Sequence, residues 1–216
     1  MDASETFTQL PLTLDSATKA LTSTDDTLAA DLTELTKLHR LFLTLETPSQ
    51  VPPPPVPVQP KRSVQITKLR ESGNLAYKRA SFADAIKMYD LAIRMASDRP
   101  AWEASGLVRE ELAALYNNRA QAYMAQQMWA EGGVDAECSV EMKRVGNVKG
   151  WWRRGQCLKE MGRFEEAVEW IRGGLEFERA GPDKQGVAEL ESLEREVEKV
   201  IAGKLAIEAP KGLALD

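Results

Sequence analysis

The chain of 216 residues is poor in the residues that metal sites and catalytic sites need. It has a single histidine, His39, and two cysteines, Cys138 and Cys157, without C-x-x-C spacing. A zinc site requires more such ligands at short spacing, so we predict no metal and no cofactor, and expect two buried thiols in a reducing compartment. Neither a glycine-rich phosphate loop nor a nucleophile–base pair is present, so the sequence does not indicate an enzyme.

Long apolar runs and net positive charge are lacking as well. No stretch reaches the roughly 18 apolar residues of a membrane span, and the acidic N-terminus is not typical of a signal peptide, so no direct membrane insertion is expected. The net charge of −5 disfavours nonspecific binding of nucleic acid. Residues 1–50 account for this excess, with eight acids and three bases. A basic groove in the balanced remainder would therefore be local and specific.

Residues 1–47 form a small N-terminal region. Apolar residues of one parity predict a short extended segment, which Pro11 restricts to an edge: Phe7, Leu10, Leu12 and Leu14. Residues 23–26 are a favourable helix start. An apolar helical face follows, made of Leu28, Leu32, Leu35, Leu38, Phe42 and Leu45. Such a small region has too little core to be stable alone, so this face must cover either the following domain or a partner.

Residues 48–62 are predicted to be a proline-rich linker. The run Val-Pro-Pro-Pro-Pro-Val-Pro-Val-Gln-Pro at 51–60 should be extended polyproline II, a semi-rigid spacer of about 3 Å per residue. A ligand for proline-reading domains is the alternative. As a spacer, the linker separates the N-terminal region from the rest of the chain, which favours a partner as the surface that the apolar face covers.

Residues 63–203 show a helical repeat. Units of 34 residues begin at Ile66, Ala113 and Val148. Positions 8, 20 and 27 of each unit are small because two helices cross closely there, whereas positions 4, 11 and 24 tend to be large. The small residues are Gly73, Ala85 and Ala92, then Ala120, Gly132 and Ser139, then Gly155, Ala167 and Gly174. The pattern predicts an all-α fold of three helix–turn–helix repeats.

Two further segments belong to this domain. The first two units start 47 residues apart, so residues 98–111 are an insertion, which we expect to lengthen the second helix of unit one and the first of unit two, with Trp102 packed. After Pro182, apolar residues at helical spacing predict a capping helix: Val187, Leu190, Leu193, Val197, Val200 and Ile201. Gly203 is its expected end, and residues 204–216 are expected to be a loose tail.

The repeat resembles the tetratricopeptide family over residues 66–180, less closely in unit two, where Gly132 and Ala136 replace the usual alanine and aromatic. The resemblance implies a superhelix whose first helices line a concave groove. Five residues are then expected to face this groove: Arg70, Asn74, Asn118, Lys149 and Arg153.

The segments that hold these five residues read Arg-Glu-Ser-Gly-Asn at 70–74, Asn-Asn-Arg-Ala at 117–120 and Lys-Gly-Trp-Trp-Arg at 149–153. They resemble the clamp with which tetratricopeptide proteins hold the two carboxylates of a terminal aspartate, with arginine in place of the commoner lysine at 70. Singly, each residue could equally be an ordinary solvated side chain. The resemblance implies that together they bind the end of another chain.

Other residues are predicted to lie near this groove. Lys78, Gln121, Trp152 and Gln156 could line it further along, with core packing as an equal alternative for Trp152. Arg119 and Arg154 adjoin the predicted clamp as additional cations.

The flanks resemble the tetratricopeptide subunits of the fungal post-translational Sec translocation complex, through the leucine-rich N-terminal region, the proline spacer and the loop Arg-Pro-Ala-Trp-Glu-Ala at 99–104. The resemblance implies a peripheral protein on the cytosolic face of the endoplasmic reticulum, held by membrane-anchored translocon subunits through residues 1–47. Its groove would take the Glu-Glu-Val-Asp tail of cytosolic heat-shock 70 chaperones. A cytoplasmic co-chaperone adaptor for heat-shock 70 or heat-shock 90 tails is the alternative, and a purely structural scaffold is a further one.

Overall fold

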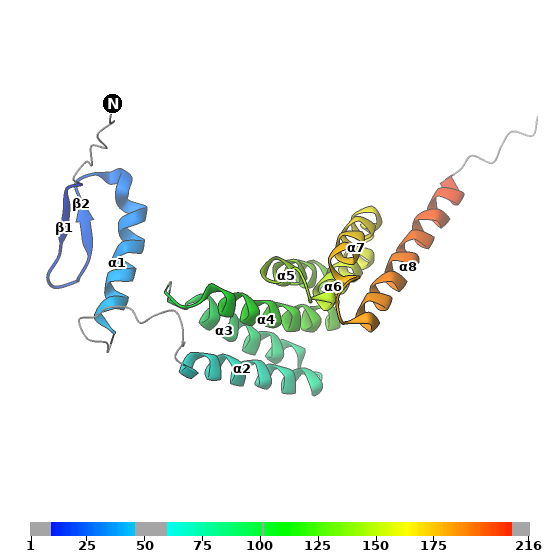
Figure 1. Cartoon of the computed structure of the whole chain (residues 1–216), viewed down its shortest axis with the longest axis horizontal. Helices are drawn as coiled ribbons and strands as arrows, with labels where there is room; N and C mark the ends of the chain where they lie inside the picture. The colour runs from blue at the N-terminus through cyan, green and yellow to red at the C-terminus, as the bar shows by residue number, and fades with distance from the viewer. Residues whose placement is uncertain (1–9, 46–59, 101, 209–216) are drawn as a thin grey trace, which may run out of the picture. The chain divides into compact units, whose positions relative to one another are not determined.

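A computed structural model describes residues 10–45, 60–100 and 102–208 (Figure 1). The chain divides into two compact units, Met1–Pro57 and Val58–Asp216. Phe7 and the proline run before Pro60 lie outside the described residues. No helix of the described part contains a stretch that is long and apolar enough to cross a membrane.

The N-terminal unit contains a two-stranded antiparallel sheet and a helix (Figure 1). Strand β1 (Leu12–Leu14) pairs with β2 (Leu21–Ser23), and a 3-10 turn, η1 (Asp26–Leu28), leads into α1 (Ala29–Leu43). The Asp25 side chain accepts a hydrogen bond from the backbone N–H of Thr27 at the predicted helix start. Strand β2 was not predicted, because Leu21 is its only apolar residue and a single apolar residue shows no alternation.

Polar contacts attach this hairpin to α1. The backbone N–H of Leu21 donates to Thr36 Oγ1 over 2.9 Å, and Arg40 donates to the carbonyl oxygen of Thr18. Leu32 is buried on the side of α1 that faces the sheet. Leu35, which we placed on the same apolar face, is 41% exposed. The predicted face is therefore only partly covered within this unit.

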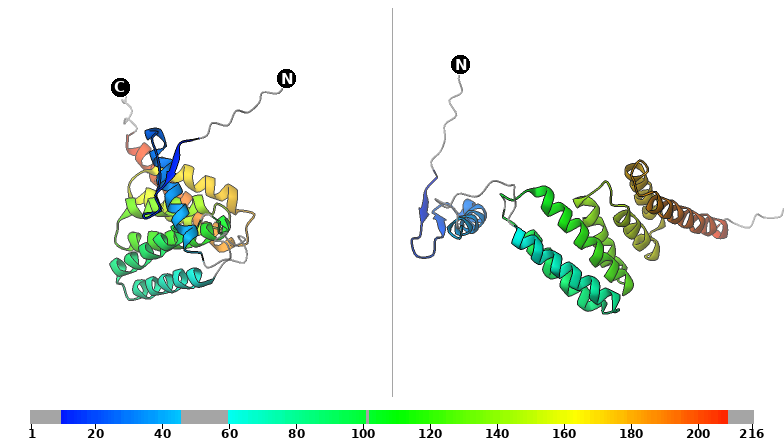
Figure 2. Two further views of the ribbon diagram at one scale, coloured as in Figure 1. Left: turned by 90° about the vertical axis from the view of Figure 1, so that its left-hand side faces the viewer. Right: turned by 60° about the horizontal axis from the view of Figure 1, so that its bottom comes forward.

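The second unit consists of paired helices stacked in chain order (Figures 1 and 2). The first repeat is α2 (Pro60–Lys78) with α3 (Phe82–Ser97), the second is α4 (Ser105–Ala125) with α5 (Trp129–Met142), and the third is α6 (Val148–Glu160) with α7 (Phe164–Glu178). Helix α8 (Lys184–Glu208) packs on both α6 and α7. The predicted all-α fold of three tetratricopeptide repeats with a capping helix is confirmed.

Close helix crossings explain the small residues of the repeat. A Cβ atom built on Gly73 would lie 2.5 Å from Tyr89 Cε1, and one on Gly155 would lie 2.7 Å from Ile171 Cγ1. Position 8 of the first and third units thus meets position 24 of the same unit. Only glycine lets the two helices approach this closely without displacing the buried side chain.

The turns within the repeats share one backbone conformation. Ala80, Gln127 and Gly162 have φ values of 58°, 59° and 75°, and they occupy the same position in successive units. Each follows the last turn of a first helix, where a left-handed residue ends the helix and redirects the chain. Two of the three are not glycine, and the same local backbone hydrogen bond holds the turn in each unit: Ser81 donates to Ala76, Met128 to Tyr123 and Arg163 to Leu158.

The insertion differs from our expectation. Helix α3 ends at Ser97 and is not lengthened, whereas α4 starts at Ser105, roughly two turns before the expected start of the unit. The loop between them is anchored by the buried Arg99, which pairs with Glu103 and Glu111 and donates to Ser63 Oγ of α2. These polar contacts favour an ordered loop over a continued helix. Trp102 in this loop is half-buried.

Two helix ends also differ. Helix α2 begins at Pro60, within the predicted linker, because proline is well suited to the first position of a helix. Helix α8 continues through Gly203 to Glu208. A single glycine costs a helix only about 1 kcal/mol, which does not suffice to end it here.

Candidate functional site

Helix α4 joins the predicted groove residues of the first and third repeats. Asn118 Nδ2 donates to Asn74 Oδ1 over 3.0 Å, and the Tyr89 hydroxyl donates to the same oxygen over 2.7 Å. These two bonds occupy the oxygen of the Asn74 amide and leave its N–H groups without a hydrogen bond in the described part of the chain. Asn74 can therefore donate to a ligand.

Arg153 of α6 also contacts α4. Its Nη1 donates to Asn117 Oδ1 over 2.9 Å and its Nη2 donates to Gln121 Oε1 over 3.0 Å. Both partners are neutral amides. Burial lowers the pKa of Arg153, against the smaller influences of Tyr77, Cys157 and Tyr89. The guanidinium has thus lost part of its hydration without gaining a counter-ion among the residues that the structure describes.

The remaining predicted cations are also without acidic partners. Arg70 is half-buried, Lys149 is exposed, and within residues 10–45, 60–100 and 102–208 neither they nor Arg153 forms an ion pair. The pKa of Tyr89 is raised to about 12, mainly by burial, while the charges of Arg153 and Arg70 oppose the rise. Both arginines therefore lie near the same phenol, although they come from different repeats.

A cavity of about 660 Å³ adjoins Arg153. Among the predicted groove residues, Lys149, Gln121 and Trp152 line it, together with side chains of α2, α4 and the start of α8. Trp152 also packs against the core of the third repeat. Lys78 is exposed at the end of α2 and Gln156 donates to Glu160 over 2.7 Å; neither lines this cavity.

Arg119 and Arg154 have structural roles. Arg119 pairs with Asp135, at 2.7 Å, and with Asp90, and it thereby connects α4 to α5 and α3. Arg154 pairs with Glu137 of α5 over 2.9 Å. These two arginines already have counter-ions, unlike the three predicted clamp cations.

Sequence reasoning missed two groups that shape the site. Asn117 belongs to the Asn-Asn-Arg-Ala segment, but only the fold brings it to Arg153. The repeat position of Tyr89 predicts a core side chain, and its ring is buried as expected. Its hydroxyl group reaches Asn74, which no periodicity reveals.

The thiols carry no reactive signature. Cys157 is fully buried, and burial raises its pKa to about 12. Cys138 is half-buried, and burial likewise raises its pKa. Both groups stay protonated at neutral pH, so neither is an activated nucleophile.

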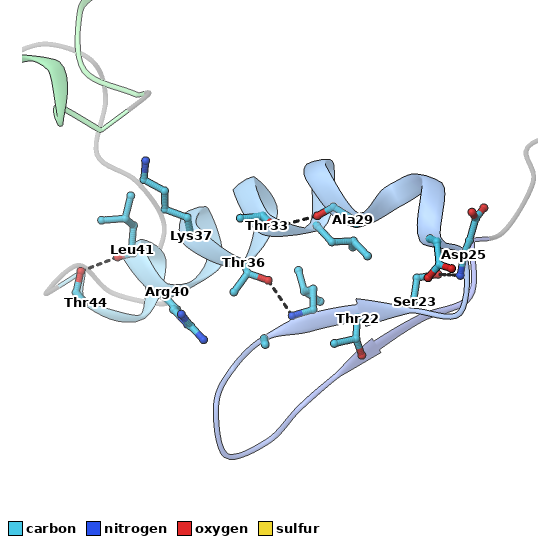
Figure 3. Close-up of a pocket in the computed structure, with 14 residues that line it drawn as sticks. Thr22, Ser23, Asp25, Ala29, Thr33, Thr36, Lys37, Arg40, Leu41 and Thr44 are labelled. Carbon is cyan, nitrogen blue, oxygen red and sulfur yellow. Dashed lines mark hydrogen bonds between the residues drawn. The ribbon is translucent and has the colours of Figure 1, made fainter.

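The N-terminal unit has a cavity of its own, of about 720 Å³, between β2 and α1 (Figure 3). Leu21 and Leu32 contribute apolar lining. Lys37 and Arg40 lie toward one end of it and Asp25 toward the other (Figure 3). The cavity thus has apolar lining between charged side chains of opposite sign.

Comparison with known proteins identifies the family, although no protein-family model matches. The chain is 36% identical over 134 residues to the endoplasmic reticulum protein translocation subcomplex subunit sec67 of Schizosaccharomyces pombe, which covers 61% of this chain and 69% of that protein. The chain belongs to this family of tetratricopeptide subunits of the Sec translocation complex. Further curated relatives match over only 10% to 19% of their own length.

Solved structures agree with this family fold. A chain of the Sec complex of S. cerevisiae matches with a TM-score of 0.69 at 22% identity, over 89% of this chain and 98% of that chain. The share of this chain is larger than the repeat unit alone comprises, so the similarity includes part of the N-terminal unit. The TPR2B domain of yeast Sti1 matches 63% of this chain and 98% of that domain, with a TM-score of 0.54 at 17% identity.

Proposed function

We propose that this translocation-associated adaptor docks cytosolic heat-shock 70 chaperones by clamping the carboxylates of their C-terminal Glu-Glu-Val-Asp tail. The clamp consists of Arg70, Asn74, Asn118, Lys149 and Arg153. In this way the protein would deliver chaperone-bound precursors for post-translational translocation. The fold is one that binds proteins, and the proposed role is non-enzymatic.

The observation that carries the proposal is the contrast between two sets of cations. Arg119 and Arg154 are paired with acids, whereas Arg70, Lys149 and Arg153 have no acidic partner in the described residues. Half-burying an arginine without a counter-ion is unfavourable unless a ligand supplies the negative charge. A terminal aspartate supplies two carboxylates, which suits cations on more than one side.

The two asparagines add directional hydrogen bonds to the attraction between the cations and the carboxylates. Asn74 keeps its amide N–H groups for a ligand, and Asn118 is held beside it by their mutual hydrogen bond. Charge-assisted hydrogen bonds contribute about 1.5–3 kcal/mol each. Three or four of them suit micromolar affinity, about −8 kcal/mol, after ordering costs are subtracted.

Related domains support this choice of ligand. The TPR2B domain of yeast Sti1 was solved as a complex with pHsp70, and the first TPR of Spaghetti (RPAP3) was solved bound to the HSP90 peptide SRMEEVD. Both share the fold of this chain. The two tail classes end alike, so a competition titration between heat-shock 70 and heat-shock 90 tail peptides decides the preference.

Titration calorimetry with a heat-shock 70 tail peptide tests the clamp. We expect micromolar binding to the natural peptide and a large loss when its terminal carboxylate is amidated, because the amide removes one of the two charges. Arg172→Ala is the matched control, since this exposed arginine pairs with Glu194 and Glu198 of α8. Equal affinity for both peptides would refute carboxylate capture.

We also propose that residues 1–47 dock the protein to membrane-anchored translocon subunits at the cytosolic face of the endoplasmic reticulum. Leu12, Leu14 and Leu35 are exposed by 41%, 52% and 41%, an apolar surface that a small unit leaves uncovered. Leu35→Lys should release the protein from membranes in cell fractionation, whereas Glu34→Lys, at the adjacent exposed position, should not. Unchanged membrane association of the Leu35 variant would refute docking through this face, and absence of the wild type from the membrane fraction would favour a free cytoplasmic co-chaperone.

A further inference from the structure

A line of side-chain amides connects Arg153 to the interior of the third repeat. Arg153 donates to Asn117 Oδ1, and Asn117 Nδ2 donates to Asn147 Oδ1 over 2.6 Å. Asn147 is 7% exposed, and its backbone N–H donates to the buried carboxylate of Glu178 over 2.7 Å. The cation at the groove is therefore connected to a fixed point in the core.

The backbone determines the direction of each amide in this line. Asn147 Nδ2 donates to the carbonyl oxygens of Ser139 and Lys143, both at 3.0 Å. Carbonyl oxygens only accept, so Asn147 must turn its own oxygen toward Asn117. Asn117 must then offer an N–H to Asn147 and its oxygen to Arg153. The carbonyl groups at the end of α5 thereby fix the orientation in which the Asn117 amide can accept a hydrogen bond from Arg153.

The same buried residue also caps the helix that carries the second cation of this repeat. The Asn147 side chain caps α6 by accepting a hydrogen bond from the backbone N–H of Gly150 over 3.3 Å. Lys149 lies in the first turn of this helix. Asn147 thus supports Lys149 through the helix start and Arg153 through Asn117.

We propose that Asn117 is a positioning residue for the clamp: it holds the guanidinium of Arg153 toward the groove without neutralising it. This inference rests on the proposed carboxylate clamp. An amide suits the task because it accepts from arginine and carries no charge. A carboxylate at this position would form an internal ion pair, as Asp135 does with Arg119, and would compete with the ligand.

A double-mutant cycle with a heat-shock 70 tail peptide tests the proposal. Asn117→Ala should weaken binding by about five- to tenfold, because it releases Arg153 from its preferred geometry. In an Arg153→Ala background the same change should have no further effect. Penalties that multiply in the double variant would overturn the proposal, since Asn117 would then act independently of Arg153.

Asn117→Asp provides a readout that a merely structural role would not change. The new carboxylate would pair with Arg153, so we expect affinity to fall below that of Asn117→Ala and to depend less steeply on salt. Affinity equal to or above that of Asn117→Ala, or an unchanged salt dependence, would contradict the positioning role.

The variants separate the two proposals. Unchanged binding by Arg153→Ala would remove the clamp and the positioning role together, whereas weak binding by Arg153→Ala with unchanged binding by Asn117→Ala would remove only the latter. Circular dichroism and thermal melting establish that each variant is folded. Gln126→Ala is the matched control, an exposed amide after the end of α4 whose side chain makes no hydrogen bond among the described residues.

Discussion

Arg153→Ala should weaken tail binding strongly and leave the stability of the repeat unit nearly unchanged, whereas Arg119→Ala should destabilise the fold. Both residues are partly buried arginines, Arg119 on α4 and Arg153 on the neighbouring α6. They differ in their partners, since Arg153 contacts two neutral amides and Arg119 contacts two carboxylates. The pair of variants therefore separates binding from folding.

The magnitudes follow from these contacts. Arg153→Ala deletes two hydrogen bonds of about 1 kcal/mol each and also removes a buried charge that has no counter-ion in the described part of the chain, so the net change in unfolding free energy should stay within about 1 kcal/mol. In the complex, the lost charge-assisted bonds should cost about 1.5–3 kcal/mol, roughly a ten- to hundredfold increase in Kd.

Arg119→Ala, in contrast, leaves a buried carboxylate without its partner. The Asp135 side chain is 5% exposed and would remain as an unpaired carboxylate between α4 and α5. Removing one partner of a buried pair costs about 3–5 kcal/mol. The lower end applies here, because the Arg119 side chain is 18% exposed and Asp90 is 34% exposed.

Urea unfolding followed by circular dichroism measures the stability of both variants, and titration calorimetry with the tail peptide measures binding. Tail affinity of Arg119→Ala should match the wild type at temperatures where the variant is folded. Equal destabilisation by the two substitutions, or unchanged binding by Arg153→Ala, would refute this reasoning.

Three other outcomes are expected. Gly155→Ala should lower the unfolding free energy in urea titrations, since overpacking against Ile171 costs about 1–3 kcal/mol and alanine regains only about 1 kcal/mol of helix propensity. Tyr89 should ionise near pH 12 instead of pH 10, measured as the difference in tyrosinate absorbance between the wild type and Tyr89→Phe. Because the pKa of Tyr89 is raised in the folded state, its contribution to stability is complete below pH 10 and is lost between pH 10 and 12. Tail affinity should fall with rising salt, less steeply for Arg153→Ala, and a flat profile in the wild type would indicate an apolar groove.

The repeat architecture could be derived from the sequence because it is local. Helical periodicity, turn residues and small positions recur within units, so Gly73, Gly155 and the turns at Ala80, Gln127 and Gly162 follow from one register. The same register put Asn74 and Asn118 on neighbouring first helices, and they are hydrogen-bonded in the structure.

Features that depend on few residues or on competing interactions were missed. Strand β2 has three residues and is stabilised by a bond from Leu21 to Thr36, 15 residues away. The loop after α3 is ordered by Arg99, whose partners lie on α2 and α4. Helix propensity could not reveal either case, because the deciding contacts are made between segments.

Spacing along the chain was enough to predict the helix pairs and their crossings, since each follows from one helix or from the repeat period, and the resemblance to the tetratricopeptide family added the five groove candidates. Spacing could not tell which arginines are already neutralised. In the folded chain Arg119 and Arg154 pair with acids, while Arg153 contacts the amides of Asn117 and Gln121. A counter-ion is defined by distance in space, and acids and cations are distributed throughout the repeats. Only the packing of α4 against its neighbours brings particular pairs within reach.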